Sequence, residues 1–321
     1  MLDGRQQERF ERQGEMLANR VKKRFKHLHK RFAREDIDVF RLYDGDIPEI
    51  RAAVDWYAGH LVVAEYVRRQ SVPEWLPIMG AAVARGLAVP ADKVHLKNRQ
   101  TGKQDGKRYE RLARTDQKIA VKERDFTFQV NLNDYVDTGL FSDHRNTRQM
   151  VRDMAAGRDF LNLYCYTGTF SCYAARGGAR TTVSVDRSRT ALDWARQNMG
   201  LNAIPEEGHP LVQSGTLAYL EDARAAGRTF DLAVVDPPSY SSDRAGNRDF
   251  DIARDHPRLL AAVLQVMRPG GTLIFSTNHQ GFELRLEGFA FSQAAEITAR
   301  TIPEDYRCKH KTIHRCWRLE I

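Results

Sequence analysis

The second half of the chain alternates apolar runs with helical patterns, and this alternation constrains the fold more than any other feature. From about residue 144, apolar strands separated by helices predict a mostly parallel sheet covered on both faces. Arg268-Pro269-Gly270-Gly271 is expected to end a helix and lead into a strand. The expected strands are DFLNLY, TTVSVD, HPLVQS, FDLAVVD, GTLIFST and AAEITAR, and KTIHRCWRLEI is expected to add an antiparallel strand.

The first part of the chain is organised differently. Residues 4–35 predict one helix, because apolar residues recur there at spacings of three and four. The apolar stripe consists of Leu17, Val21, Phe25, Leu28 and Phe32. The runs IDVFRLY, HLVVAEYV, DKVHLKNR and FTFQVNL, with one helix beginning near Pro73, predict a small α+β domain. The expected parts are therefore an N-terminal basic helix at 1–35, a small RNA-binding domain at 36–131 and a catalytic domain at 132–321.

Composition excludes several classes of protein. Hydrophobic residues make up 42% and charged residues 29% of the chain, which is typical of a water-soluble globular protein. The sequence has no run of about 20 apolar residues, and its first residues, MLDGRQQERF, lack the apolar core of a signal peptide. Four irregularly spaced cysteines do not form a disulfide framework. We therefore expect a cytoplasmic protein.

The chain is basic, with a formal net charge of +8 and a pI of about 9.3. This charge favours a polyanionic partner such as RNA, although a basic surface that faces only water is the alternative. Basic residues cluster on the N-terminal helix and in HLKNRQTGKQDGKRYERL, which resembles a hairpin with turns at Gly102 and Gly106. The candidate RNA-binding residues are Lys22, Lys23, Arg24, Lys97, Arg99, Lys103, Lys107 and Arg108.

Polar or turn-forming residues follow the expected strands, at the edge where parallel sheets bind ligands. The loop NLYCYTG has one glycine, Gly168, where a dinucleotide-binding loop has three. Asp186 follows eighteen positions later and is able to accept both hydroxyls of a ribose, although such a residue is often only a helix cap. A later strand ends in Asp236, Pro237 and Pro238, followed by Tyr240, and the prolines must end the strand.

The order and spacing of these strand ends resemble the class I S-adenosylmethionine-dependent methyltransferases. The resemblance implies a Rossmann-like sheet of seven strands whose last hairpin is antiparallel. It implies that the NLYCYTG loop lies by the methionine part of S-adenosylmethionine, that Asp186 holds the ribose, and that the Asp236 loop faces the methyl group. The cofactor-binding residues that it implies here are Asn162, Tyr164, Thr167, Gly168, Asp186, Arg187 and Asp236.

The motifs DTGLFSDHR, FDIARDH and FSTNHQGF narrow the resemblance to the large-subunit rRNA methyltransferases, most closely the C-terminal half of the bifunctional 23S rRNA guanine methyltransferases. The implied reaction is methylation of guanine N7 in 23S rRNA or a large-subunit precursor, with a second methyltransferase half as a further expected partner. Thr138, Phe141, Asp143 and Arg145 are implied to close over the cofactor. The chain departs from the family at Gly215, where members usually carry an acidic residue near the adenine.

The residues from Asp236 to Tyr240 bear on which atom accepts the methyl group. A pyrimidine C5 acceptor requires a cysteine nucleophile, and FSTNH, the loop after the fifth strand, has none. An exocyclic amine of guanine or adenine stays open, because Asp-Pro-Pro with a nearby aromatic residue fits that chemistry loosely. Guanine N7 has an in-plane lone pair and no proton to lose, so positioning is sufficient. Asp236, Pro237, Pro238 and Tyr240 are the predicted catalytic residues, with Tyr240 stacking on the base or packing on its neighbours.

A metal site and two other classes of protein are alternatives to a methyltransferase. The run CKHKTIHRC places Cys308, His310, His314 and Cys316 within nine residues, but the spacing is unlike that of structural zinc sites, and we predict no metal. His144 and His256 are interpreted as orienting or capping groups. A non-catalytic RNA-binding assembly factor is the alternative that Gly215 favours. A nicotinamide dehydrogenase is disfavoured by the missing glycines.

Overall fold

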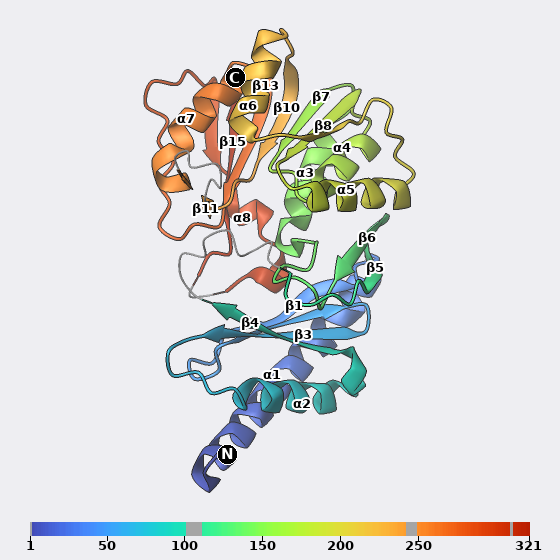
Figure 1. Ribbon diagram of the computed structural model, residues 1–321, viewed down its shortest axis with the longest axis vertical. Helices are drawn as coiled ribbons and strands as arrows, with labels where there is room; N and C mark the ends of the chain where they lie inside the picture. The colour runs from blue at the N-terminus through green and yellow to red at the C-terminus, as the bar shows by residue number, and fades with distance from the viewer. Residues whose placement is uncertain (1, 101–110, 242–248, 309–310) are drawn as a thin grey trace. The chain divides into compact units, whose positions relative to one another are not determined.

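The computed structural model describes residues 2–100, 111–241, 249–308 and 311–321 (Figure 1). The chain forms two compact units. The first comprises Met1–Thr138 with Glu304–Cys308, and the second comprises Gly139–Pro303 with Lys309–Ile321. No helix in the described part of the chain combines the length and the apolar character needed to cross a bilayer.

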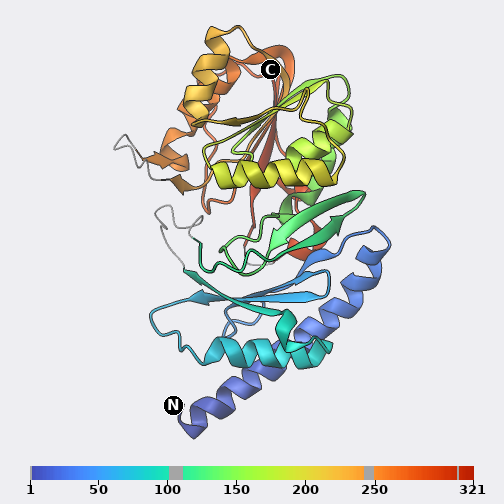
Figure 2. The same ribbon diagram turned by 45° about the vertical axis from the view of Figure 1, so that its right-hand side comes forward.

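The first unit is a four-stranded sheet with two helices packed on one face (Figure 2). The strand order is β1-β2-β3-β4, and only β3 and β4 run parallel. A separate antiparallel hairpin is formed by β5 and β6. The elements are α1 (Gly4–Ala33), β1 (Val39–Asp44), β2 (Ala52–Tyr57), β3 (His60–Val67), α2 (Trp75–Leu87), η1 (Ala91–Lys93), β4 (Val94–Gln100), β5 (Lys118–Glu123) and β6 (Phe126–Asn131).

Helix α1 follows the apolar pattern that predicted it. Asp3 caps its N-terminus by accepting a hydrogen bond from the backbone N–H of Gln6 (2.7 Å). Four residues of the stripe, Leu17, Val21, Leu28 and Phe32, are buried against the sheet and α2, and Phe25 is half-buried. The stripe therefore attaches α1 to the first unit, so that the helix and the small domain share one core.

The second unit contains the predicted seven-stranded sheet, in the order β14-β15-β13-β10-β7-β8-β9. All neighbours are parallel except β15, which is antiparallel to both β13 and β14, so the prediction of an antiparallel last hairpin is confirmed. The strands are β7 (Asp159–Leu163), β8 (Thr181–Asp186), β9 (Leu211–Gln213), β10 (Phe230–Val235), β13 (Met267–Thr277), β14 (Gln293–Glu296) and β15 (Arg315–Glu320), and a short ribbon pairs β11 (Tyr240–Ser241) with β12 (Phe250–Asp251).

Both faces of this sheet are covered, as Figure 1 shows. Alternate residues of the strands pack against α6 and α7 on one face, and the residues between them pack against α3 and α4 on the other. Such two-sided burial explains why the strand sequences are continuously apolar. The helices are α3 (Arg145–Met154), α4 (Thr169–Arg176), α5 (Arg189–Leu201), α6 (Thr216–Ala225), α7 (Ile252–Leu264) and α8 (Thr298–Thr301), with 3-10 turns η3 (Ser142–His144) and η4 (Glu304–Tyr306).

Two local predictions are corrected, and the expected basic hairpin is described only in part. Helix α7 ends at Leu264, and Arg268–Gly271 lies within β13, because Met267 already pairs with Phe230 and a bulge separates that pair from the rest of the ladder. The run AAEITAR is a strand only up to Glu296. The first arm of the expected basic hairpin pairs in parallel with β3, and its turn lies outside the described residues.

Candidate active site

The candidate site lies at the carboxyl edge of the parallel strands in the second unit. The central strand β7 lies between β10 and β8, and the strand order reverses there, since β8 and β9 extend one way while β10 and β13 extend the other. The register pairs Leu163 with Val185 and with Val235, so the residues that follow these strands begin at the same level. Crevices at such reversal points are where open α/β sheets bind ligands.

Asp186 ends β8 with its carboxylate held in place. Its Oδ2 accepts a hydrogen bond from the backbone N–H of Tyr166 (3.0 Å), and its Oδ1 accepts one from Ser188 (2.8 Å). Burial raises the pKa of Asp186, and these hydrogen bonds act against that shift. Each carboxylate oxygen has a second lone pair, so the group keeps capacity to accept the two hydroxyls of a ribose.

The Tyr164–Gly168 loop contains three residues in the left-handed region, Tyr164 (φ 58°), Tyr166 (φ 49°) and Gly168 (φ 74°). Such conformations cost free energy in residues other than glycine and are concentrated at functional sites. Thr167 Oγ1 donates a hydrogen bond to the backbone carbonyl of Gly139 (2.6 Å). Gly139 is the first residue of the second unit, so this bond attaches the loop to the segment that opens the unit.

The structure gives a packing reason for the glycine at position 168. A Cβ atom there would lie 2.8 Å from the Cβ of Ala195 on helix α5, which is too close for an unstrained contact. The glycine thus allows α5 to approach the loop, in addition to adopting a positive φ.

Three residues expected at the cofactor have other surroundings. The Asn162 side chain is buried and donates to Ser171 Oγ (2.9 Å), so it joins β7 to α4 in the interior. The Arg145 side chain is buried, with its Nε donating to the carbonyl of Ser142 (3.3 Å). Thr138 belongs to the first unit and exchanges a hydrogen bond with the hydroxyl of Tyr57 (2.9 Å). Arg187, by contrast, is exposed beside Asp186.

Aromatic rings lie on the strand-end loops. The rings of Phe141 and Tyr166 are 5.3 Å apart between centroids, and 39% of Phe141 is exposed. Tyr164 lies 6.2 Å from Phe250 between ring centroids, and burial raises its pKa to about 12, so its hydroxyl stays protonated. Gly215 begins helix α6, and a Cβ added there would meet open space. The site therefore combines ribose acceptors with apolar ring faces and open space at Gly215, which fits an adenosyl group.

Asp236 directly follows β10, and both of its carboxylate oxygens have partners. Ser276 Oγ, on the neighbouring strand β13, donates to Oδ1 (2.6 Å), and the Nε2 of His144 lies 3.5 Å from Oδ2. The side chain is 26% exposed. Ser239 Oγ also donates to Asn278 Oδ1 (2.7 Å), so two hydrogen bonds tie the proline-containing loop to β13 and the loop after it.

Tyr240 lies on the short ribbon that follows the two prolines. Its backbone pairs with Asp251, and its hydroxyl donates to Asp249. The ring is half-buried. Because the ribbon and the prolines both restrict the backbone, the ring is presented from a rigid support. Its stacking on a base stays a prediction.

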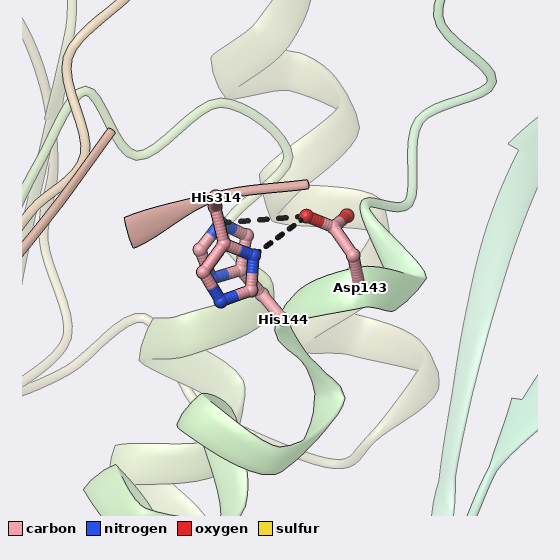
Figure 3. A group of neighbouring side chains, drawn as sticks. All are labelled: Asp143, His144 and His314. Carbon is pink, nitrogen blue, oxygen red and sulfur yellow. Dashed lines mark hydrogen bonds and ion pairs between the residues drawn. The ribbon is translucent and has the colours of Figure 1, made fainter. Parts of the chain in front are cut away.

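The histidines occupy ordered positions. His144 stacks on His314, with ring centroids 4.2 Å apart and an angle of 11° between the planes (Figure 3). His314 Nδ1 lies 3.0 Å from Asp143 Oδ2, so Asp143 directs its carboxylate at this pair. His256 is buried in α7, where its Nε2 accepts from the backbone N–H of Arg285 (3.0 Å) and thereby holds the loop after β13.

Sequence reasoning missed the pairing of His314 with Asp143. The two residues are 171 positions apart, and nothing local to either one indicates the contact. The one local signal was a histidine within the expected strand KTIHRCWRLEI, and the structure begins that strand one residue later, at Arg315. His314 also lies 3.0 Å from Thr301 through its Nε2.

The cysteines that lie in the second unit's interior are not available as nucleophiles. Burial raises the pKa of Cys172 to about 12 and that of Cys165 well above its ordinary value. Cys316 is buried in β15 within the core, and Cys308 belongs to the first unit. The buried thiols thus act as small apolar groups of the core. His310 lies outside the described residues.

The basic candidates fall into different environments. Lys22 and Lys23 are exposed on α1. Arg24 donates to the backbone carbonyl of Glu304 (3.1 Å). Lys97 is buried, donating to the carbonyl of Tyr135 (2.6 Å), and burial lowers its pKa to about 8, so its assignment to an exposed RNA-binding surface is corrected. Arg99 is half-buried, and Lys103, Lys107 and Arg108 lie outside the described residues.

The sheet order, the carboxylate at the end of β8 and the Asp-Pro-Pro loop after β10 agree with the class of S-adenosylmethionine-dependent methyltransferases that the sequence resembles. A family model described as "S-adenosylmethionine-dependent methyltransferase" matches residues 46–298, which is well over half of the chain. The chain belongs to this family, and its cofactor is S-adenosylmethionine.

Solved structures share the fold. The crystal structure of SMU.776, assigned as a methyltransferase and complexed with SAH, superposes with a TM-score of 0.79 at 21% identity, covering 97% of this chain and 82% of that one. A SAM-dependent methyltransferase from Agrobacterium tumefaciens gives a TM-score of 0.61 at 16% identity, covering 89% and 90%. The structure of aTrm5 with tRNALeu gives 0.54 at 12% identity, covering 92% and 75%.

Proposed function

We propose that the protein transfers a methyl group from S-adenosylmethionine to N7 of a guanine in 23S rRNA, as the resembling RlmK half of the bifunctional enzyme RlmKL does. The observation that supports this most is the fixed Asp236 loop at the reversal point of the sheet. A lone pair on N7 attacks the sulfonium methyl group, and no proton must leave. The protein then has only to hold N7 in line with the sulfonium methyl group, and a loop stiffened by two prolines is well suited to hold the base in this way.

The individual residues have the following proposed roles. Asp186 accepts the ribose hydroxyls, and the Tyr164–Gly168 loop lies by the methionine part of the cofactor. Asp236 accepts a hydrogen bond that orients the base, and Tyr240 stacks on the base after it leaves its helical stack. S-adenosylmethionine supplies the electrophilic methyl group when bound. The buried cysteine thiols, with raised pKa values, support an acceptor other than pyrimidine C5, since that chemistry requires a thiolate.

An exocyclic amine is the second candidate acceptor. It is favoured by the partial exposure of the Asp236 carboxylate, because an ionised carboxylate can accept the hydrogens of an amine. A non-catalytic RNA-binding factor on the same scaffold is a third candidate, which the intact ribose acceptor at Asp186 disfavours.

The RNA partner, a 23S rRNA or a large-subunit precursor, is proposed to bind partly through helix α1. Residues 16–34 contain no acidic side chain, and basic side chains there are exposed in one stripe. These exposed residues are Lys22, Lys26, Lys30 and Arg34, which recur every four residues, and Lys23, which is adjacent to Lys22. Cytoplasmic location and pairing with a second methyltransferase half complete the proposal.

The test is transfer of labelled methyl from S-adenosylmethionine to 23S rRNA that lacks its modifications, with the product nucleoside identified by mass. N7-methylguanosine is expected. An N2-methylguanosine or N6-methyladenosine product would favour the amine acceptor. RNA binding without transfer, in a protein that also fails to bind S-adenosylmethionine, would favour the non-catalytic factor.

A further inference from the structure

Two buried histidines and two half-buried carboxylates lie close together in the second unit. The 3-10 turn η3 contributes Asp143 and His144, and the segment before β15 contributes His314 (Figure 3). Asp236, which directly follows β10, lies near His144. His144 is 5% exposed and His314 only 1%. Neither imidazole therefore acts directly on a bulky substrate such as a nucleotide.

The geometry disfavours a metal ion, although Asp143, His144 and His314 bring three potential ligand atoms within 4.8 Å of one another. The two imidazole planes are nearly parallel, at 11°, with their centroids 4.2 Å apart. A ring nitrogen binds metal in the plane of its ring, so stacked rings cannot direct both lone pairs at one ion. Both nitrogens of His314 also have hydrogen-bond partners, Asp143 and Thr301.

The neighbouring groups favour one tautomer of His144. Its Nε2 lies 3.5 Å from Asp236 Oδ2 and 3.8 Å from Asp143 Oδ2, and because ionised carboxylates only accept hydrogen bonds, a proton on Nε2 suits both contacts. Its Nδ1, 3.4 Å from Thr147 Oγ1, is then the acceptor in a neutral ring. By the same reasoning, His314 donates from Nδ1 to Asp143.

We propose that His144 is a positioning residue, held by stacking on His314, whose Nε2–H orients the Asp236 carboxylate for the base. Asp143 holds the histidine pair by accepting a hydrogen bond from His314. The inference rests on the proposed methyl transfer, because the orientation of Asp236 matters only if that carboxylate contacts the substrate.

Protonation is expected to disturb this arrangement. Burial, and then the neighbouring His314, lower the pKa of His144, while Asp236 and Asp143 raise it and Arg148 lowers it. The ring is thus neutral around pH 7. In acid, an imidazolium would pair with Asp236 and weaken it as an acceptor for the base. Activity should therefore fall as the pH drops below the ordinary histidine pKa of about 6.5.

The test compares kcat, KM and their pH profiles for His144→Gln and His144→Phe. Glutamine keeps a donor near the Nε2 position but does not titrate, so kcat should stay within a few-fold and the acid limb from this group should disappear. Phenylalanine keeps the stacked ring without the donor, so kcat should fall on the order of 10- to 100-fold with KM for S-adenosylmethionine unchanged. His256→Gln, at a buried histidine outside the group, should leave the pH profile as it is.

A second measurement does not depend on activity. Nitrogen NMR of the histidines should show His144 protonated at Nε2, with its pKa moving down in Asp236→Asn. Failure of the proposed function would appear as a wrong or absent product while this NMR result persists. The positioning role is overturned if the neutral ring carries its proton on Nδ1, if Asp236→Asn leaves the pKa of His144 unchanged, or if His144→Phe transfers methyl at the wild-type rate.

Discussion

At the scale of single residues, the site depends on side chains whose orientation is set by their neighbours. Asp186 receives two backbone N–H groups, and Asp236 lies between a hydroxyl and an imidazole. Gly215 has no side chain at a position where family members usually have an acidic one. It has φ −68° and ψ 139°, an extended conformation that any residue adopts, and the space at its Cβ is open.

Gly215→Asp is therefore predicted to strengthen cofactor binding without harming the fold. The new carboxylate can cap helix α6, which stabilises the protein by a few tenths of a kcal/mol relative to glycine. A hydrogen bond from the adenine amino group would contribute about 1.5 kcal/mol, which corresponds to about tenfold tighter binding. Calorimetric titration with S-adenosylmethionine measures this, with Gly215→Ala as the control. Equal affinities of the two variants would contradict the predicted contact.

Variants of Tyr240 distinguish the two roles considered for its ring, stacking on the target base and packing on neighbouring side chains. If its ring stacks on the target base, Tyr240→Ala should lower kcat/KM for RNA about tenfold or more, since such a contact is worth about 1–3 kcal/mol. Tyr240→Phe keeps the ring and loses only the hydrogen bond to Asp249, so it should remain near the wild-type rate. The affinity for S-adenosylmethionine should be the same in all three proteins. Wild-type turnover by Tyr240→Ala would rule out the stacking role.

At the scale of elements, the Tyr164–Gly168 loop is held by the close approach of α5 as well as by its own hydrogen bonds. Asn198 on this helix donates to the carbonyl of Thr167 (2.9 Å), and Gly168 faces Ala195. The left-handed residues Tyr164 and Tyr166 lie in the same loop. Their strain is offset by contacts that depend on where α5 lies, so the loop conformation depends on helix packing.

Gly168→Ala is predicted to destabilise the second unit. The left-handed backbone costs about 1–2 kcal/mol for alanine, and displacing Ala195 costs about 1–3 kcal/mol more. Urea unfolding measures the change in the free energy of unfolding. Gly208→Ala is the matched control, because Gly208 has a similar φ of +79° and its Cβ would meet only one atom, at 3.9 Å. A loss of stability no larger than that of the control would show that the approach of α5 is not limiting.

At the scale of the whole molecule, a basic α1 is joined in one chain to a methyltransferase sheet. The buried residues of the apolar stripe hold α1 on the core of the first unit, while Lys22, Lys26 and Lys30 are exposed. RNA binding by the intact protein should therefore depend strongly on salt, because each phosphate contact releases counterions.

Replacing Lys22, Lys26 and Lys30 by alanine is predicted to weaken RNA binding and to reduce the slope of log K against log[salt] by about 2 to 3, with kcat at saturating RNA unchanged. The control replaces Arg5, Arg9 and Arg12, which lie among Glu8, Glu11 and Glu15 on the same helix and should have little effect. Filter binding at several salt concentrations measures both slopes. Equal slopes in the two triple variants would contradict the predicted surface.

The sequence by itself determined the features that depend on local pattern. Two-sided burial makes the strands of the sheet continuously apolar, and the 3.6-residue period of a helix gives α1 its stripe. Strand-end residues such as Asp186 and Asp236 could be located because parallel strands bring their carboxyl ends to one edge. These signals sufficed for a mostly parallel sheet with a ligand site at its carboxyl edge, while the antiparallel last hairpin and the cofactor came from the resemblance to the methyltransferases.

Only the tertiary structure decided which distant side chains meet. Lys97 lies in a basic run, yet its ammonium group is buried against the Tyr135 carbonyl. Arg268–Gly271 has the composition of a helix stop, but the ladder with β10 extends the strand through it. The contact of His314 with Asp143 joins segments that chain connectivity leaves independent. Hydrogen bonds and ring stacking act over a few ångströms in space, so a local sequence pattern carries no record of them.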